Sequence, residues 1–264
     1  SNKSICLFSS NLFFHILKHN SLMGFLESKY LYLGLLVASI SYPLAQSFEW
    51  RIQLYKNWKS LFLSILIMMS LFIPWDVWFT KEGVWWFRND YTLGFTIFDL
   101  PIEEWLFFII VPYACIFIYE VLNFYIKKDI FRLFSKPFFL TLGLILLIFS
   151  FTYFPKHYTS FTFGLTGIFC LFFAFLKPNW LGRFLLMYLV SFIPFLLVNG
   201  ILTGCFIKAP IVNYNSNEII GLRILTIPIE DYIYNLLMLF IVIFFFEKFR
   251  KTNRQKKHHN NPSL

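Results

Sequence analysis

Residues 97–120 read IFDLPIEEWLFFIIVPYACIFIYE. Two neighbouring acids, Glu103 and Glu104, follow a proline, and an almost unbroken apolar run then continues to Tyr119. A helix needs about 20 apolar residues to cross the hydrocarbon core of a bilayer. Proline is favoured in the first turn of a helix, where its missing N–H is not needed. The stretch therefore predicts a membrane helix that begins at Pro101 and carries both acids in its first turn.

The rest of the chain has the same apolar character. Of its 264 residues, 58% are hydrophobic and 14% are charged, and the mean hydropathy is +0.64, which is too apolar for a soluble domain of this length. We predict an all-α fold, a polytopic transmembrane helical bundle of seven spans with no room for a separate soluble domain. The spans are Tyr30–Phe48, Ser60–Trp78, Pro101–Tyr119, Pro137–Phe154, Tyr158–Leu176, Phe184–Phe206 and Pro228–Phe246.

The acidic motif occurs twice. Residues 224–236 read ILTIPIEDYIYNL, so Pro-Ile-Glu followed by a second acid recurs at Glu230 and Asp231. A weaker echo, Phe-Ile-Pro at 72–74 and 192–194, precedes each copy. Because four spans separate equivalent positions, both copies have the same orientation, as in a parallel repeat about an axis along the membrane normal. Both acid pairs then lie on one membrane face and can meet in one central site.

This repeat divides the chain into five parts. We predict a first repeat at 30–136, a linking transmembrane span at 137–156 and a second repeat at 157–249. Residues 250–264 form a basic tail. Residues 1–29 form an N-terminal extension, and because Met23 offers an alternative start, we interpret the segment before it as not native.

The net charge of +9 comes largely from short loops and from the tail. Lys and Arg are concentrated in the loops after spans one, three and five and at the C-terminus, so the positive-inside rule places the C-terminus in the cytoplasm. The predicted location is a bacterial inner membrane, crossed several times. Orientation in the lipid bilayer explains the basic residues, and no nucleic-acid partner is predicted.

The paired acids admit two interpretations. A carboxylate in the first turn of a helix is stabilised by the helix dipole by about 0.3–1 kcal/mol, so the acids can be caps at the water interface, with Asp99 and Thr226 as nearby capping residues. The motif occurs twice and each copy holds two adjacent acids, which favours a functional role instead. Two carboxyls close together in a low-dielectric site cannot both ionise easily, so one stays protonated and can act as a general acid on an apolar substrate. The predicted acid and base set is Glu103, Glu104, Glu230 and Asp231.

Aromatic residues are dense in the segment before the first motif. An interfacial aromatic belt explains isolated Trp and Tyr residues. Ring faces also stabilise cations, which an acid acting on an alkene would produce. Acids beside aromatic rings therefore predict carbocation chemistry on a polyene. The predicted substrate-binding residues are Trp75, Trp78, Trp85, Trp86, Trp105 and Tyr232.

The chain resembles the membrane-bound lycopene cyclase domain proteins in three segments. They read PWDVWFTKEGVWWF at 74–87, IFDLPIEEWLFFIIVPYACIFIYE at 97–120 and TIPIED at 226–231. These cyclases are paired small subunits in some bacteria, fused chains in others and the cyclase part of a fungal bifunctional enzyme. The resemblance extends from Tyr30 to about Phe249.

Lycopene β-cyclase activity in carotenoid biosynthesis is what this resemblance implies. A terminal alkene of lycopene is protonated, the end closes to a β-ionone ring and a proton is removed, giving γ- and β-carotene. This is an isomerisation by an intramolecular lyase that needs no redox equivalent, and the chain has no GxGxxG dinucleotide motif. Carried over by position, the resemblance makes Glu103 and Glu230 the leading candidates for proton donor or acceptor. Their neighbours Glu104 and Asp231 are then expected to tune the pKa of these two residues. Asp76 in the PWD segment is a further candidate.

No cofactor and no metal are predicted, because the histidines form no ligand cluster. The four cysteines lack CxxC spacing and are predicted to be neither disulfides nor metal ligands. The predicted partners are lycopene or a related acyclic carotenoid, the lipid bilayer, and a second copy of the chain or neighbouring carotenoid enzymes.

Two alternative functions stay open. A membrane prenyltransferase would hold Mg²⁺ with Asp-rich clusters, whereas the aspartates here are dispersed. A proton-coupled transporter would also use paired acids, but nearer to the middle of the membrane. The second motif copy is weaker, because Phe195–Asn199 lacks the Trp-rich character and Asn213–Glu218 is a polar insertion without a counterpart. Whether both ends of lycopene are cyclised is therefore left open.

Overall fold

All seven predicted spans are helices in the structure, a computed structural model that describes residues 24–260 and the side chains of residues 24–252. Among the described residues, six helices are long and apolar enough to cross a membrane, and α3 is a shorter apolar helix. The predicted all-α membrane bundle is confirmed. The helices are α3 (Leu31–Gln46), α4 (Trp58–Lys81), α5 (Ile102–Tyr125), α6 (Ser135–Thr152), α7 (His157–Leu176), α8 (Leu181–Leu202) and α9 (Ile229–Asn260).

Short elements fill the connections. Two 3-10 helices, η1 (Leu54–Asn57) and η2 (Asn89–Tyr91), lie before α4 and after β1. The strands form three antiparallel pairs, which join β1 to β4, β2 to β3 and β5 to β6. Their bounds are β1 (Trp85–Phe87), β2 (Thr96–Ile97), β3 (Leu100–Pro101), β4 (Val212–Tyr214), β5 (Arg223–Ile224) and β6 (Ile227–Pro228).

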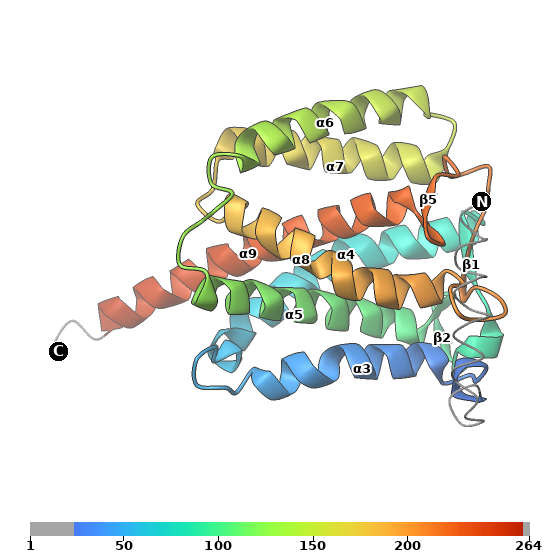
Figure 1. Cartoon of the computed structure of the whole chain (residues 1–264), viewed down its shortest axis with the longest axis horizontal. Coiled ribbons are helices and arrows are strands. Elements are labelled where there is room, and N and C mark those ends of the chain that lie inside the picture. The colour runs from blue at the N-terminus through green and yellow to red at the C-terminus, as the bar shows by residue number, and fades with distance from the viewer. Residues whose placement is uncertain (1–23, 261–264) are drawn as a thin grey trace.

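The helices lie side by side, with α6 and α7 along one edge, α3 along the other and the strands gathered at one end of the bundle (Figure 1). Within each predicted repeat, the first helix packs on the third: α3 on α5, and α7 on α9. Between the repeats, α4 packs on α9 and α8 packs on α5. Equivalent helices of the two repeats thus make equivalent contacts, as expected for two repeats related by a two-fold axis along the membrane normal. The boundaries of the five predicted parts stay a prediction.

Aromatic side chains form much of the core in the half of the bundle away from the strands. Phe184 of α8 stacks on Phe240 of α9 with 4.3 Å between ring centroids, and Phe139 of α6 and Phe173 of α7 each lie 5.0 Å from Phe240. All four rings are almost completely buried. Aromatic pairs at these distances add to the packing energy beyond the buried area. Helices α6, α7, α8 and α9 are therefore held together by one ring cluster.

Two local predictions were wrong. Asp99 and Thr226 do not cap α5 and α9, because both residues lie in the turns of the β2–β3 and β5–β6 hairpins. There Asp99 has a φ of +67° and its exposed side chain lies 3.9 Å from Lys81, while the Thr226 hydroxyl bonds to Thr203. Cys205 is disulfide-bonded, which sequence spacing did not reveal because spatial pairing does not depend on spacing. Cys115 and Cys170 are buried free thiols, as predicted, and Cys6 lies outside the described residues.

Candidate active site

The two acidic motifs follow hairpins of the same length and register. Hairpin β2–β3 precedes α5, hairpin β5–β6 precedes α9, and the pairs Thr96–Pro101 and Arg223–Pro228 have the same register. Gly94 and Gly221 precede these hairpins with φ of +78° and +89°, a region that favours glycine. At the start of both helices, therefore, the backbone structure repeats as well as the sequence.

The first acid of each motif ties its loop to the helix. Glu103 accepts a hydrogen bond from the Leu93 amide at 2.7 Å, and Glu230 accepts the equivalent bond from the Ile220 amide at 2.7 Å. Glu230 also accepts a bond from the Thr159 hydroxyl at 2.6 Å. Both glutamates are fully buried, and neither lines the cavity between the two repeats. They hold the loops that shape this end of the bundle.

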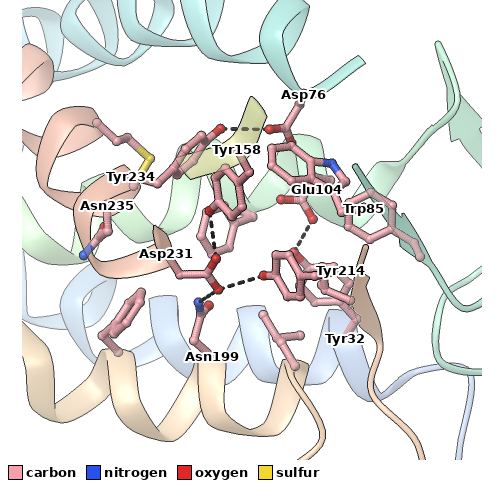
Figure 2. A pocket seen from close by; sticks show the side chains of 16 residues that line it. Tyr32, Asp76, Trp85, Glu104, Tyr158, Asn199, Tyr214, Asp231, Tyr234 and Asn235 are labelled. Carbon is pink, nitrogen blue, oxygen red and sulfur yellow. Dashed lines mark hydrogen bonds between the residues drawn. The ribbon is translucent and has the colours of Figure 1, made fainter. Parts of the chain in front are cut away.

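The second acid of each motif points into that cavity. Glu104 accepts a hydrogen bond from the Tyr32 hydroxyl of α3 at 2.6 Å. Asp231 accepts bonds from the hydroxyls of Tyr158 and Tyr214, both at 2.7 Å, and a longer one from the Asn199 amide at 3.3 Å. The two equivalent acids thus face one space from opposite repeats, each with a tyrosine from the first helix of its own repeat (Figure 2).

Asp76 is the third carboxyl of the cavity. It lies on α4, near the end of the Trp-rich helix, and accepts a hydrogen bond from the Tyr234 hydroxyl of α9 at 2.8 Å. Figure 2 shows Asp76, Glu104 and Asp231 pointing toward the same space. All three are buried. The structure therefore brings together three of the five predicted acids, and their hydrogen-bond donors are phenols and an amide.

Strands β1 and β4 join the two repeats at this end of the bundle. These two strands are far apart in the sequence and pair in antiparallel orientation, with Trp85 opposite Tyr214. The Trp85 ring packs edge-on against Tyr158 at 4.9 Å, and the Tyr158 and Tyr214 rings lie parallel at 6.0 Å. The segment interpreted as a polar insertion without a counterpart thus contributes the last two residues of β4, which is the partner of the Trp-rich strand β1. This structural role was not apparent from the sequence, because pairing between distant strands leaves no local sequence pattern.

Tyr214 is the one hydroxyl donor among these that lies on a strand and not on an apolar helix. Burial raises the pKa of its phenol well above the usual value, and the neighbouring Asp231 raises this pKa further. A phenol with a raised pKa keeps its proton at physiological pH. Tyr214 therefore stays a hydrogen-bond donor to Asp231.

The cavity itself is small and ring-lined, with a volume of about 60 Å³. This is room for several water molecules, since one water molecule needs a space of at least about 10–15 Å³. Its apolar lining comes from both repeats. The side chains other than the acids and their donors are Trp85, Phe87, Phe107, Phe195, Leu202, Val212, Asn235 and Met238.

Of the six aromatic residues predicted to bind substrate, only Trp85 lines this cavity. Trp75 packs against Tyr234 at 5.2 Å, just behind the wall. Trp78 and Trp86 are a little under half exposed, and Trp105 donates to the Ile97 carbonyl. Tyr232 is buried among Phe192 and Phe195. A substrate role for these five residues stays a prediction, and the structure does not place them in the cavity lining.

Sequence reasoning missed the tyrosines. Tyr234 and Asn235 lie three and four residues after Asp231 on α9, the spacing that places side chains on one helix face, so this pair could have been found. Tyr32, Tyr158 and Tyr214 come from other elements and gave no such signal. Among the described residues, no group of His, Cys, Asp and Glu has an arrangement that could hold a metal ion.

Comparison with known proteins gives one consistent match. The sequence model described as lycopene cyclase matches residues 29–122 and 155–249. Over short segments the chain is similar to the bifunctional lycopene cyclase/phytoene synthases of Aspergillus oryzae (28% identical over 74 residues), Colletotrichum graminicola (37% over 65) and Arthroderma gypseum (39% over 51).

These alignments cover 28%, 25% and 19% of the chain and only 13%, 11% and 9% of the relatives, respectively. The chain thus aligns with about a tenth of the length of these relatives. No solved structure matches the chain.

Proposed function

The chain belongs to the lycopene cyclase family, and from this premise we propose that it is a lycopene β-cyclase, which converts the acyclic ends of lycopene to β-ionone rings. The observation that carries the proposal is the convergence of Asp76, Glu104 and Asp231, from both repeats, in one cavity lined by aromatic rings. Acid catalysis on an alkene needs a proton donor, a proton acceptor and stabilisation of a carbocation between the two steps.

In the proposed reaction, a carboxylic acid donates a proton to the terminal alkene and leaves a tertiary carbocation. The next alkene attacks this carbon, so that a carbon–carbon bond closes a six-membered ring and the positive charge moves to a ring carbon. A carboxylate then removes a proton from the neighbouring ring carbon, and the ring alkene forms. One proton enters and one leaves, so the reaction is an isomerisation without electron transfer.

We assign the proton donor to Glu104, supported by Asp76, and the proton acceptor to Asp231. Hydrogen bonds donated to a carboxyl stabilise its ionised form. Asp231 receives three such bonds, whereas Glu104 and Asp76 receive one each. A buried carboxyl that receives few hydrogen bonds and lies near a second carboxyl favours the protonated form, which is the form that can donate a proton.

This assignment differs from the one drawn from sequence, which favoured Glu103 and Glu230. Those residues bind backbone amides and lie outside the cavity, so we propose that they position the loops that carry Glu104 and Asp231. In the proposed mechanism the faces of Trp85, Tyr158 and Tyr214 stabilise the carbocation through their π electrons.

The cavity volume of about 60 Å³ is smaller than a carotenoid end group. In the proposed reaction the end group therefore displaces water and moves apolar side chains that line the cavity, such as Phe107, Phe195 and Leu202. Lycopene dissolves in the hydrocarbon core of a bilayer, and a bundle of membrane-spanning helices meets it there. We propose a multi-pass membrane location, with the basic C-terminus in the cytoplasm.

The test is expression of the whole chain in a lycopene-accumulating bacterial host, followed by chromatography of the pigments. The unaltered chain should convert lycopene to γ- or β-carotene. The isosteric variants Glu104→Gln and Asp231→Asn should each lower this conversion by about 100-fold or more, the usual loss when a general acid or base is removed.

Asp90→Asn is the matched control, because Asp90 is an exposed acid in the loop at the same end of the bundle. It should leave conversion unchanged. Unchanged lycopene beside well-inserted unaltered protein would reject the proposed reaction. Full conversion by both cavity variants would reject the proposed site while leaving the reaction intact.

A further inference from the structure

A second, larger cavity of about 450 Å³ opens at the other end of the bundle. Helix α5 carries Glu104 in its first turn and Tyr119, Glu120 and Asn123 of the second cavity near its end. The 24 residues of this helix span about 36 Å, close to the thickness of a bilayer. The two cavities therefore lie near opposite membrane faces, and the second has no part in the proposed cyclisation.

The second cavity is rich in basic side chains. Its lining includes two acids and five cations, so its formal charge is positive. The acids are Glu120 and Glu247, and the cations are Arg51, Lys127, Arg183, Arg250 and Lys251.

Arg250 engages both acids. Its guanidinium lies 2.6 Å from Glu120 and also pairs with Glu247, which accepts a further bond from the Tyr119 hydroxyl at 2.8 Å. Arg250, Glu120 and Glu247 are all largely buried. This cluster joins the end of α5 to α9 and holds one base against two acids, so the five bases and two acids of the lining give a formal charge of +3. Arg51 also lies 3.7 Å from Glu49, which is outside the lining.

Arg183 is held in a fixed position at the cavity. Its guanidinium donates to the Asn123 side chain at 2.7 Å and to the Lys127 carbonyl at 2.9 Å, where the chain leaves α5. The Lys127 ammonium lies 4.5 Å from the Phe124 ring centroid. Ile52, Phe124 and Trp180 provide apolar lining beside these cations. Charge and apolar surface thus lie together at this end of the bundle.

We propose that this cavity binds the phosphate group of an anionic membrane phospholipid. Guanidinium and ammonium groups recognise phosphate oxygens by charge-assisted hydrogen bonds. Basic pockets between transmembrane helices near the cytoplasmic surface bind anionic headgroups, whose acyl chains stay in the bilayer. The apolar lining favours a lipid over a free phosphate ion, because only the lipid brings apolar surface to cover it.

The proposal is tested by native mass spectrometry of the whole chain in a neutral detergent. The probes are dioctanoyl phosphatidylglycerol, dioctanoyl phosphatidylcholine and inorganic phosphate. The dissociation constant should be at least about tenfold lower for phosphatidylglycerol than for phosphatidylcholine. The double variant Lys127→Gln, Lys251→Gln should weaken phosphatidylglycerol binding by about 30-fold, the combined effect of two lysines near a headgroup.

The control is Lys136→Gln with Lys177→Gln, which removes the same charge from the same end of the bundle but outside the cavity lining. Its dissociation constant should stay within about twofold of the unaltered chain, well below the change expected for a lost headgroup contact. Arg51→Gln serves as a second cavity variant if the double variant does not fold. Equal binding of the two lipids, or equal loss in cavity and control variants, would overturn the proposal. Competition by inorganic phosphate at the same concentration as phosphatidylglycerol would also overturn it, in favour of a soluble phosphate.

Discussion

Neighbouring acids in each motif have different surroundings because successive residues of a helix point about 100° apart. Glu103 turns toward the backbone of its loop, whereas Glu104 turns toward the cavity and Tyr32. The same division separates Glu230 from Asp231. A motif of two acids thus supplies one residue that holds a loop and one that faces the cavity.

The variant Glu103→Gln distinguishes two roles of Glu103, proton donor in the reaction or residue that only holds the loop. The Oε1 atom of Glu103 accepts the Leu93 amide, while its Oε2 atom is buried without a hydrogen-bond partner among the described residues. If Glu103 only holds the loop, the variant should lower the free energy of unfolding by about 1–3 kcal/mol, the cost of weakening the hydrogen bond of a buried polar group. Cyclisation per folded molecule should then persist.

Thermal unfolding in detergent and pigment chromatography give the two readouts for this variant. Loss of cyclisation in a variant of unchanged stability would restore Glu103 as the proton donor predicted from sequence. The sequence could not decide between the neighbours, because the direction of each side chain depends on the loop and on Tyr32, which is distant in the chain. It did single out residues that the structure places in the lining of the cavity, namely Asp76, Trp85 and the second acid of each motif.

At the scale of single elements, α6 contributes packing and no cavity side chain. It packs on α7 through Gly143, where a Cβ atom would lie 2.9 Å from the Gly167 carbonyl oxygen and 2.9 Å from Leu171. Small residues at such a contact let two membrane helices approach closely. The linking span therefore depends on glycine at this point.

Gly143→Val should destabilise the α6–α7 pair. Overpacking against a backbone atom costs about 1–3 kcal/mol, which should appear as a lower unfolding temperature in detergent. Leu144→Val on the exposed face of the same helix is the control and should change little. An unfolding temperature of Gly143→Val equal to that of the control would show that the two helices can separate without loss.

The helices were predictable from sequence, whereas the strands were not. Each span is recognised by a run of about 20 consecutive apolar residues, and most helix boundaries in the structure differ from the predicted ones by only a few residues. Strands of two or three residues have no such period. The β1–β4 pair brings Trp85 to Tyr214 from the other repeat, and only the packing of the whole bundle determines that contact.

At the scale of the molecule, the cavity is complete only when both repeats are present. Tyr32, Asp76 and Glu104 come from the first, and Tyr158, Tyr214, Asp231 and Tyr234 come from the second. The cross contacts of α4 with α9 and of α5 with α8 hold the two together. Neither repeat alone supplies the acids and their donors.

Two separate polypeptides, 1–128 and 129–264, should therefore restore cyclisation when expressed together in the lycopene-accumulating host. The break falls in the loop between α5 and α6, away from the cavity. Either polypeptide alone should leave lycopene unchanged, as measured by pigment chromatography. Conversion by one polypeptide alone would contradict a site shared between the repeats.

The β1–β4 pairing also constrains how the protein is made. Strand β1 emerges from the ribosome soon after α4, but its partner β4 follows only after α8, more than 120 residues later. Contacts between such distant segments form late, since the intervening chain must first be placed. Asp231 and Tyr234 come later still, on α9. The acid cluster is therefore completed in the final step of membrane insertion. A chain arrested before α9 carries Glu104 with its donor Tyr32, but it lacks Asp231 and the Tyr234 hydroxyl that donates to Asp76.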